Sequence, residues 1–556
     1  MPKVDFKLWD LERIAGKSFH IDELTHIVTT LKGEIEEVSG DTIVFEASHD
    51  RPDLFSVEGL ARAVGVFVGS RDLIRYSVED SGTYLDVSEA PRYRPYAFMA
   101  IVENLRLDDE AVSQIFQLQE KLHATYCRDR ASVSIGLYDL DKVKPPFRYV
   151  AVKNATYVPL GYSHKMSLDE VLKETEKGMT YAHLVKPGEY PIIIDSEDHI
   201  FSFPPILNDE LSRVTVDTKR VVIDVTGVEP YLMMKVLNVI TTSVAERSPK
   251  PVIKLVSIKG LEKNGYSKTP DLNGKLVSFK VDDVESLLGF NPLENNGVTL
   301  LKKMGYVVKE LANDVVTVWV PPFRVDVLNH VDVIEDLAIA YGYNNIIPEI
   351  LPPTHFGKRY DIERFSDIVR EVLVGLGLQE IMNFMLIDPE ILKSIVKDKG
   401  FVSLANPKMK IYSSVRNSLI PSIMLAVKTN LEKRKNFEIF EIGDIVEIPY
   451  EGSVTYVRSL SYALVGENYT LTDALVILKS LMSYLGVNYK LVKDKEEFLI
   501  EGRSARIVVN NDVQVGVVGE VKPEVLTSLN IYTPVTVCEL NLKKLYDSIT
   551  ASNTPS

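Results

Sequence analysis

The sequence is poor in cysteine and lacks long apolar runs. Only two cysteines occur among its 556 residues, Cys127 and Cys538. They lie far apart and neither belongs to a CxxC motif, which argues against a thiolate metal site and favours a reducing compartment. No apolar run reaches the roughly 18 residues of a membrane span, and the charged first turns do not resemble a signal peptide. The sequence therefore predicts a cytoplasmic protein.

Several catalytic motifs are also absent from the sequence. It contains no GxxxxGK[ST] phosphate loop and no GxSxG nucleophile motif, and its nine histidines show no HExxH spacing. Acidic residues outnumber basic ones: the sequence has 78 aspartates and glutamates but 63 lysines and arginines, which gives a net charge of −15. Proteins that coat nucleic acids are usually basic. Any contact with RNA must therefore come from a local patch or from a partner subunit.

The length and the residue pattern predict several domains. At about 100–200 residues per domain, 556 residues correspond to about three to five domains. We expect an N-terminal domain over 1–90, a domain of alternating strands and helices over 91–265, a small module over 266–347 and a large module over 355–550. The prolines of PEILPPTH, residues 348–355, predict an irregular linker before the last module. The expected fold class is α+β and multidomain.

An acidic helix ends the small module. Asn329 is a suitable N-cap and Gly342 a natural stop. A 3.6-residue period places an apolar face of Val331, Ile334, Leu337, Ala338 and Tyr341 opposite an acidic face of Asp332, Glu335 and Asp336. Asp326 lies upstream and could bend back towards them. The acidic face is either a solvated surface, favoured by the helix dipole, or a site for a hard cation such as Mg²⁺.

Five sequence blocks carry a resemblance to a known family. They are SHDRPDLFSVEGLARAVG (48–65), IFSFPPILNDE (200–210), VVIDVTG (221–227), FEIFEIGDIV (437–446) and VGVVGEVKPEVL (515–526). Together with the acidic helix they resemble β subunits of archaeal- or eukaryotic-type phenylalanyl-tRNA synthetases. Two positions depart from the family pattern: Asp50 stands where Asn is common, and IEGRSA (500–505) stands where HPGR is frequent.

The resemblance implies a fold and a set of partners. It implies an editing-type α/β domain, a winged-helix-like small module and a class II synthetase-like antiparallel-sheet domain without catalytic residues. The partners would be the α subunit, in an α₂β₂ heterotetramer, and phenylalanine tRNA. ATP and phenylalanine would bind through the α subunit. In the family, four acidic residues at this spacing bind magnesium together with the α subunit. The matching residues of this sequence are Asp326, Asp332, Glu335 and Asp336.

The editing block suggests a second site. An apolar pocket rejects an added hydroxyl only by about 10²-fold, so a synthetase can gain accuracy by hydrolysing tyrosine wrongly attached to the tRNA. Asp224 and Thr226 alternate to the same face of a strand and could bind a phenol, although Asp224 could instead cap a turn. The expected pocket residues are Ser202, Pro204, Pro205, Asn208, Asp224 and Thr226.

The last module is expected to have lost its chemistry. Phosphate transfer requires positive charge aimed at the developing phosphate charge. The strands NFEIFEIGDIV and VGVVGEVKPE, where class II catalytic subunits carry arginines, contain none. A predicted helix near 421–434 ends in a basic cluster that could contact tRNA, although such clusters are more often solvated: Lys428, Lys433, Arg434 and Lys435.

Three functions remain open at this point. The first is a ligase β subunit with proofreading and scaffold roles. The second is a purely structural or RNA-binding subunit without hydrolytic activity. The third, a free-standing nucleic-acid-binding protein, fits poorly with a net charge of −15.

Overall fold

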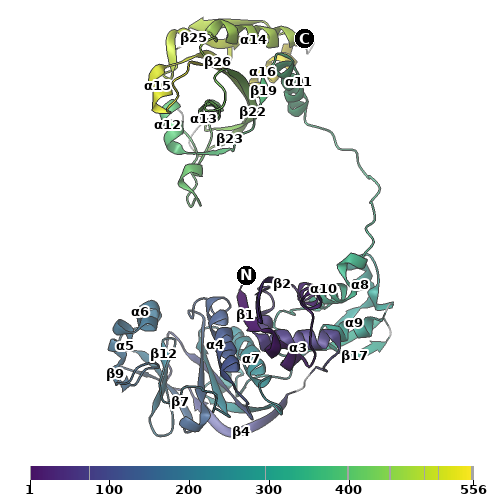
Figure 1. The fold of residues 1–556 in the computed structure, drawn as a ribbon, viewed down its shortest axis with the longest axis vertical. Helices are drawn as coiled ribbons and strands as arrows, with labels where there is room; N and C mark the ends of the chain where they lie inside the picture. Colours follow the sequence, from purple (N-terminus) through teal and green to yellow (C-terminus); the bar gives the residue numbers. More distant parts are fainter. Residues whose placement is uncertain are drawn as a thin grey trace. The chain divides into compact units, whose positions relative to one another are not determined.

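The computed structural model describes residues 2–73, 76–294, 296–312, 314–396, 400–449, 452–493, 495–510 and 512–552. The chain folds into two compact units, Met1–Glu349 and Ile350–Ser556, and both combine helices with sheets (Figure 1). Among the described residues, no helix is both long and apolar enough to cross a membrane.

The first unit begins with a small sheet covered by helices. Its strand order is β1-β3-β2, and helices α1 and α3 pack on each other beside it. Ser56 caps α3 by accepting a hydrogen bond from the Gly59 amide, and Gly69 ends the helix in a left-handed conformation. The bounds are β1 (Lys3–Lys7), β2 (Gly33–Ser39), β3 (Thr42–Ala47), α1 (Leu8–Ala15), α2 (Ile21–Thr30) and α3 (Val57–Val68).

A ten-stranded mixed sheet forms the centre of the first unit. Its order is β12-β11-β10-β7-β4-β14-β5-β13-β6, and β15 pairs with β14. Helices α4 and α7 pack on the β5-β13-β6 end (Figure 1). The strands are β4 (Ser77–Asp86), β5 (Tyr96–Glu103), β6 (Val133–Asp139), β7 (Phe147–Val152), β10 (Tyr190–Ile194), β11 (Ile200–Phe203), β12 (Leu207–Asn208), β13 (Val221–Gly227), β14 (Val252–Lys259) and β15 (Lys268–Thr269). The remaining elements are α4 (Asp109–Ala124), α7 (Pro230–Ala245), the two-stranded pair β8 (Thr156–Tyr157) and β9 (Met166–Ser167), α5 (Leu168–Glu174) and α6 (Glu176–Tyr181).

A third sheet, β16-β18-β17, and three helices complete the first unit. The elements are β16 (Lys275–Lys280), α8 (Val281–Leu288), α9 (Gly297–Lys303), β17 (Val307–Ala312), β18 (Val315–Val320) and α10 (His330–Tyr341). The main core of the unit contains buried apolar side chains from Val4 to Ile339, and a separate cluster of buried apolar side chains lies between Val150 and Ile206. The domain boundaries expected near residues 90 and 265 stay predictions.

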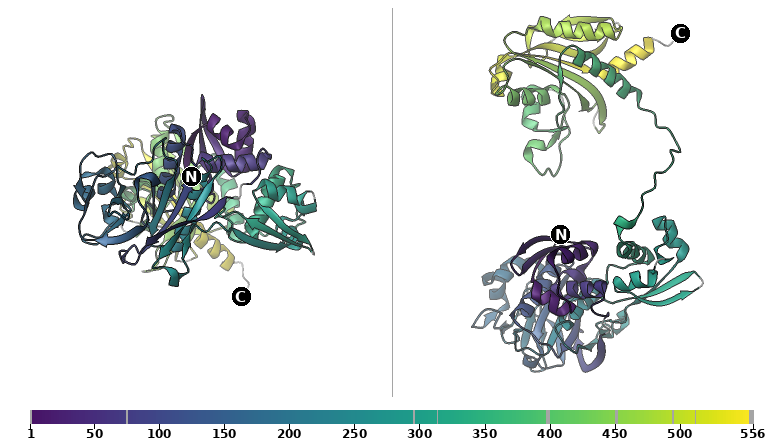
Figure 2. Two further views of the ribbon diagram at one scale, coloured as in Figure 1. Left: turned by 90° about the horizontal axis from the view of Figure 1, so that it is seen from below. Right: turned by 45° about the vertical axis from the view of Figure 1, so that its right-hand side comes forward.

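The second unit is a seven-stranded sheet with helices on both faces. Its order is β19-β22-β23-β27-β26-β25-β24, antiparallel except for the parallel pair β19–β22. Helices α11, α14 and α16 cover one face and α13 covers the other (Figures 1 and 2). The strands are β19 (Gln379–Glu380), β22 (Phe437–Glu447), β23 (Thr455–Val465), β24 (Tyr489–Lys493), β25 (Leu499–Val509), β26 (Val513–Val521) and β27 (Val535–Asn541), with the separate pair β20 (Leu386–Ile387) and β21 (Ser414–Val415). The helices are α11 (Asp361–Gly375), α12 (Pro389–Ile395), α13 (Ile420–Asn430), α14 (Leu471–Tyr484), α15 (Pro523–Ser528) and α16 (Leu542–Ser552).

The acidic helix predicted from the sequence is α10, with Asn329 as its N-cap and Gly342 as its C-cap. The assignment of its faces was partly wrong. Val331, expected on the apolar face, is 43% exposed, whereas Asp336, expected on the opposite, acidic face, is only 2% exposed. The buried face of the helix contains Ile334 and Leu337, as expected, together with Val333 and their neighbours.

Candidate functional site

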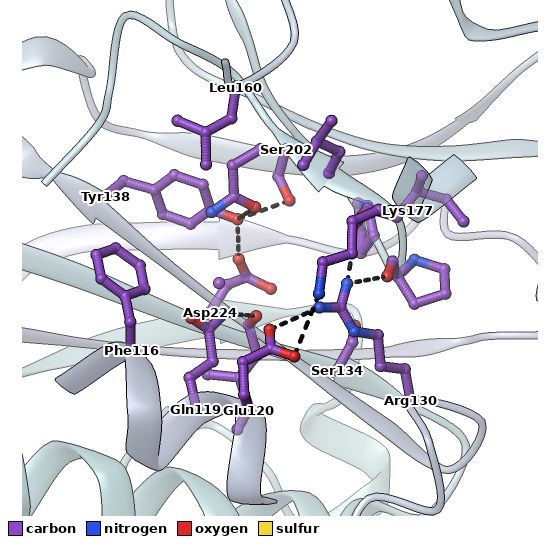
Figure 3. Close-up of a pocket in the computed structure, with 17 residues that line it drawn as sticks. Phe116, Gln119, Glu120, Arg130, Ser134, Tyr138, Leu160, Lys177, Ser202 and Asp224 are labelled. Carbon is purple, nitrogen blue, oxygen red and sulfur yellow. Dashed lines mark hydrogen bonds and ion pairs between the residues drawn. The ribbon is translucent and has the colours of Figure 1, made fainter. Parts of the chain in front are cut away.

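A pocket opens at the β13–β6 end of the large sheet, beside the β11–β12 hairpin (Figure 3). Its volume is about 120 Å³. Five of the six predicted pocket residues line it: Ser202, Pro204, Pro205, Asn208 and Asp224. The other lining residues are Phe116, Gln119, Glu120, Arg130, Ser134, Ile135, Gly136, Tyr138, Leu160, Lys177, Ile206 and Leu207. Residues more than eighty positions apart in the sequence thus share one cavity.

The hydroxyl of Tyr138 is the centre of the polar wall. Its oxygen lies 2.5 Å from Asp224 Oδ1, 2.7 Å from Ser202 Oγ and 3.1 Å from Asn208 Oδ1. A phenol has a single hydrogen, and the carboxylate is the strongest acceptor of the three. Tyr138 therefore donates to Asp224, while Ser202 Oγ–H can donate back to Tyr138. Asp224 Oδ2 makes no hydrogen bond within the described residues and remains available to a ligand.

Gly136 makes the contact between Tyr138 and Asp224 possible. It lies on β6 opposite Asp224 on β13. A Cβ atom at this position would lie 2.0 Å from the Tyr138 hydroxyl and 2.3 Å from Asp224 Oδ1. The backbone at Gly136 does not have a positive φ, so the glycine is required for space rather than for conformation.

Burial raises the pKa of Asp224 to about 7, and Tyr138 and Arg94 oppose this rise only in part. The carboxyl group therefore changes charge near neutral pH. Thr226, two residues further along β13, does not line the pocket. Its hydroxyl contacts Ser134 Oγ at 2.9 Å and accepts a 3.1 Å hydrogen bond from Arg94 Nε. Thr226 thus positions Ser134, which is part of the lining.

Three charged side chains, Arg130, Glu120 and Lys177, form another wall of the pocket. Arg130 donates to Glu120 at 2.9 Å and to the carbonyl oxygens of Pro205 and Ile206 at 2.9 and 3.0 Å. Lys177 lies 3.3 Å from the second oxygen of Glu120. Burial works to raise the pKa of Glu120, but His123, Arg130 and Lys177 outweigh it and hold the value at about 2. Arg130 therefore fixes the proline wall, and Glu120 stays ionised.

The sequence reasoning missed Tyr138, Gly136, Gln119, Arg130 and Glu120. A usable signal was present, since Ser134, Gly136 and Tyr138 alternate along SIGLYD and must share one face of a strand. No sequence signal joins Arg130 to Pro205, because that contact depends on the path of two separate loops.

The four carboxylates predicted to bind magnesium do not converge in this chain. Arg324 Nη2 contacts Asp326 Oδ2 at 2.7 Å and Asp336 Oδ2 at 2.5 Å. Asp332 accepts from the Leu328 and Asn329 amides as part of a capping box, and Glu335 pairs with Lys32 at 2.9 Å. Within the described residues, no group of three or more acidic, His or Cys side chains is placed to hold a metal ion. The set does not fit Mg²⁺ in the chain alone.

The basic cluster predicted to touch tRNA lies at and just after the end of α13. Lys428 lies in its last turn, and Lys433, Arg434 and Lys435 lie in the segment between α13 and β22. All four side chains are exposed. The arrangement is open to a partner, and a contact with tRNA stays a prediction.

Comparison with known proteins places these features in a family. Residues 347–542 match the family described as "Phenylalanyl tRNA synthetase beta chain CLM domain", and residues 277–343 match the "tRNA synthetase B5 domain". The phenylalanine–tRNA ligase β subunits of Thermofilum pendens and Pyrococcus furiosus are each 39% identical to this chain. The first match covers 98% of both chains, and the second covers 98% of this chain and 100% of the relative. A crystal structure of an N-terminal fragment of the Pyrococcus horikoshii phenylalanyl-tRNA synthetase β subunit is 40% identical, with a TM-score of 0.58. That match covers 62% of this chain and 100% of the fragment.

Proposed function

This chain belongs to the family of phenylalanine–tRNA ligase β subunits, and we propose that it is the proofreading and scaffold subunit of an α₂β₂ ligase. In this proposal the α subunit binds ATP and phenylalanine, forms the adenylate and esterifies the tRNA by class II chemistry. The β chain removes tyrosine that has been attached to phenylalanine tRNA by mistake. The observation that carries the proposal is the ligand-accessible carboxylate of Asp224 in a pocket lined by five of the predicted editing residues.

The pocket offers a tyrosyl ring both apolar contact and one polar partner. Phe116, Ile135 and Leu160 supply apolar lining, and Asp224 presents Oδ2 at the polar wall. A tyrosine phenol can donate to that oxygen. A phenylalanine ring cannot, so its binding would leave a buried carboxylate oxygen without a partner. Such an unpaired group penalises the wrong ligand far more than an apolar wall can.

Hydrolysis then adds water across the ester carbonyl and releases tyrosine and the terminal ribose hydroxyl of the tRNA. The residues of this chain hold the amino acid in place for that step. Asn208, which lies 3.1 Å from the Tyr138 hydroxyl, is suited to orient the water or the ribose. Ser202 and Tyr138 keep Asp224 in position.

Magnesium in this proposal requires the α subunit. Each of the four carboxylates already has a partner in this chain, and Asp326 and Asp336 share the Arg324 guanidinium. Asp336 is buried, Asp326 and Asp332 are partly exposed, and Glu335 is exposed. Oxygen ligands from the partner would have to complete a site for a hard cation, which otherwise keeps several waters.

The proposal is tested with Asp224→Ala in the assembled complex. We expect deacylation of tyrosyl-tRNA to slow by about 10–150-fold, which corresponds to the loss of one hydrogen bond to a charged group. Synthesis of phenylalanyl-tRNA should be unchanged. Asp141→Ala is the matched control, because Asp141 is an exposed acid just beyond β6 that pairs with Arg220. Clearance at the wild-type rate by the Asp224 variant would favour the alternative, a structural or RNA-binding subunit without hydrolytic activity.

A further inference from the structure

A second and larger cavity lies elsewhere in the first unit. Its volume is about 490 Å³. Its walls come from α7, from the β14–β15 hairpin, from the start of β16 and from the loop between β18 and α10. The residues on which the argument rests are Tyr231, Lys235, Asn238, Tyr266 and Lys275. None of them belongs to the pocket that contains Asp224.

Two lysines bring positive charge to the wall of this cavity. Lys235 Nζ donates to the Val325 carbonyl at 3.1 Å, and Lys275 Nζ donates to the carbonyl oxygens of Val327 and, at 3.2 Å, Leu328. Within the described residues, neither lysine forms an ion pair with a carboxylate. An ammonium group has three donors, so each lysine keeps at least one hydrogen for a ligand.

The other basic side chains of the cavity are already neutralised. Lys268 pairs with Asp80, and Arg324 is bound to Asp326 and Asp336. Burial lowers the pKa of Lys275. The positive charge of Lys235 lowers this pKa further, whereas Tyr231 raises it. Asp332 and Asp326 act in the same direction as Tyr231. Two cations that repel each other at the wall of a cavity favour an anion between them.

The walls also supply flat surfaces and a polar group. Tyr231 is 68% exposed, and the Lys235 ammonium lies 4.7 Å from its ring centroid. Pro270, Pro321 and Pro322 add rigid apolar lining. Asn238 is 7% exposed, and its amide donates to the Asp271 carbonyl at 2.7 Å. That bond fixes the orientation of the amide and leaves Oδ1 without a partner among the described residues.

We propose that this cavity binds a nucleotide unit, with Lys235 and Lys275 on its phosphate and the exposed ring of Tyr231 against its base. Lysine ammonium groups bind phosphate oxygens as point charges. Aromatic rings accept any base by stacking. In a chain with a net charge of −15, such a site would give a local contact with a polyanion that the overall charge opposes. The nucleotide could be part of an RNA strand or a free mononucleotide, and the proposal does not depend on proofreading.

Three probes separate the components of the proposed site: inorganic phosphate, adenosine monophosphate and a short fluorescent single-stranded RNA. Titration calorimetry measures the first two with the purified full chain, and fluorescence anisotropy measures the third. Lys235→Gln and Lys275→Gln should each weaken binding of the nucleotide probe by about tenfold or more, as expected for a charge-assisted contact. Lys302→Gln is the matched control, because Lys302 is an exposed lysine on α9.

Tyr231→Ala distinguishes base binding from phosphate binding. It should weaken adenosine monophosphate and RNA about tenfold, as expected for the loss of one stacking surface, and leave inorganic phosphate unchanged. Because Tyr231 is largely exposed, this variant should fold even if a lysine variant does not; thermal unfolding checks each protein. Loss confined to RNA identifies a nucleotide within a strand, and loss confined to the monophosphate identifies a free nucleotide. Wild-type binding of both nucleotide probes by the folded lysine and tyrosine variants would overturn the proposal.

Discussion

At the scale of single residues, the burial of Asp224 has a measurable effect on stability. Burial raises its pKa from 3.8 to about 7 in the folded chain. Between pH 3.8 and about 7 the folded chain therefore holds a proton that the unfolded chain has released. Stability rises with pH only where the unfolded state binds more protons. The contribution of Asp224 to the free energy of unfolding thus falls as the pH rises through this window.

Asp224→Asn removes this titration and keeps an oxygen that can accept from Tyr138. We expect the variant to be more stable than wild type at pH 8, by on the order of a few kcal/mol at most, and to lose this advantage at pH 4. Thermal unfolding of the full chain at both pH values measures the difference. Asp141→Asn, at an exposed position, should show no such pH-dependent gain. A gain of equal size at both pH values would contradict the assigned pKa.

Gly136→Ala tests the contact between Tyr138 and Asp224. The new methyl group would overlap the Tyr138 hydroxyl and Asp224 Oδ1, which it would approach to 2.0 and 2.3 Å. Overpacking of this kind costs about 1–3 kcal/mol. We expect a lower unfolding temperature and a loss of tyrosyl-tRNA clearance by the complex, while aminoacylation persists. Gly375→Ala is the control, since a Cβ there meets nothing within 4 Å. Full clearance by the folded Gly136 variant would show that this contact is dispensable.

At the scale of secondary-structure elements, the acidic helix α10 shows what periodicity can and cannot predict. Its start and end follow from Asn329 and Gly342, because caps are local. Its buried and exposed faces cannot be predicted in the same way, because Asp336 is buried against Arg324 and Tyr306, which lie 12 and 30 residues earlier in the sequence. A carboxylate with such partners can occupy a core position. The same limit applies to the pocket: alternation pairs Asp224 with Thr226, but only the sheet order brings Tyr138 to Asp224.

The magnesium prediction also belongs to α10. Asp332→Asn with Glu335→Gln removes two carboxylates of the set, the partly exposed Asp332 and the exposed Glu335. We expect the assembled complex of this variant to contain less magnesium and to assemble less well, because the partner's ligands would face an incomplete site. In the lone chain, equilibrium dialysis should show no difference between variant and wild type. Asp282→Asn with Glu285→Gln, an exposed pair at the same spacing on α8, is the control. Equal magnesium in both complexes would leave the acidic face as a solvated surface.

At the scale of the whole molecule, the proposed binding sites lie in the first unit, whereas the second unit is proposed to serve assembly. The first unit contains the pocket and the nucleotide cavity. The second unit is mainly a sheet with two helical faces. The presence of its strands could be predicted from the sequence, since segments such as FEIFEIGDIVE are long and place an apolar residue at nearly every second position. The order of its seven strands could not, because that order depends on contacts far apart in the sequence.

The charges of the second unit argue against adenylate chemistry. Strands β22 and β26 contain no arginine. Arginines on neighbouring segments are paired with carboxylates: Arg416 contacts Glu441 at 2.6 Å, Arg458 contacts Asp444 at 2.9 Å, and Arg503 contacts Glu520 at 2.7 Å. A guanidinium bound to a carboxylate offers little charge to a phosphate. The sheet itself remains well packed, with Phe440, Tyr462 and Leu478 in its core.

We therefore expect the lone chain to be inactive in phenylalanine-dependent ATP–pyrophosphate exchange. Loss of a single preorganised donor costs about 10²–10³ in rate, and neither β22 nor β26 carries an arginine that could act on a phosphate. Addition of the α subunit should restore exchange, because the synthetic site would lie there. The measurement compares the lone chain, the α subunit and their mixture, with a mock purification as the control for host enzymes. Exchange by the lone chain above that control would mean that the second unit keeps a synthetic site of its own. Activity that appears only in the mixture would instead support a sheet retained for assembly rather than for chemistry.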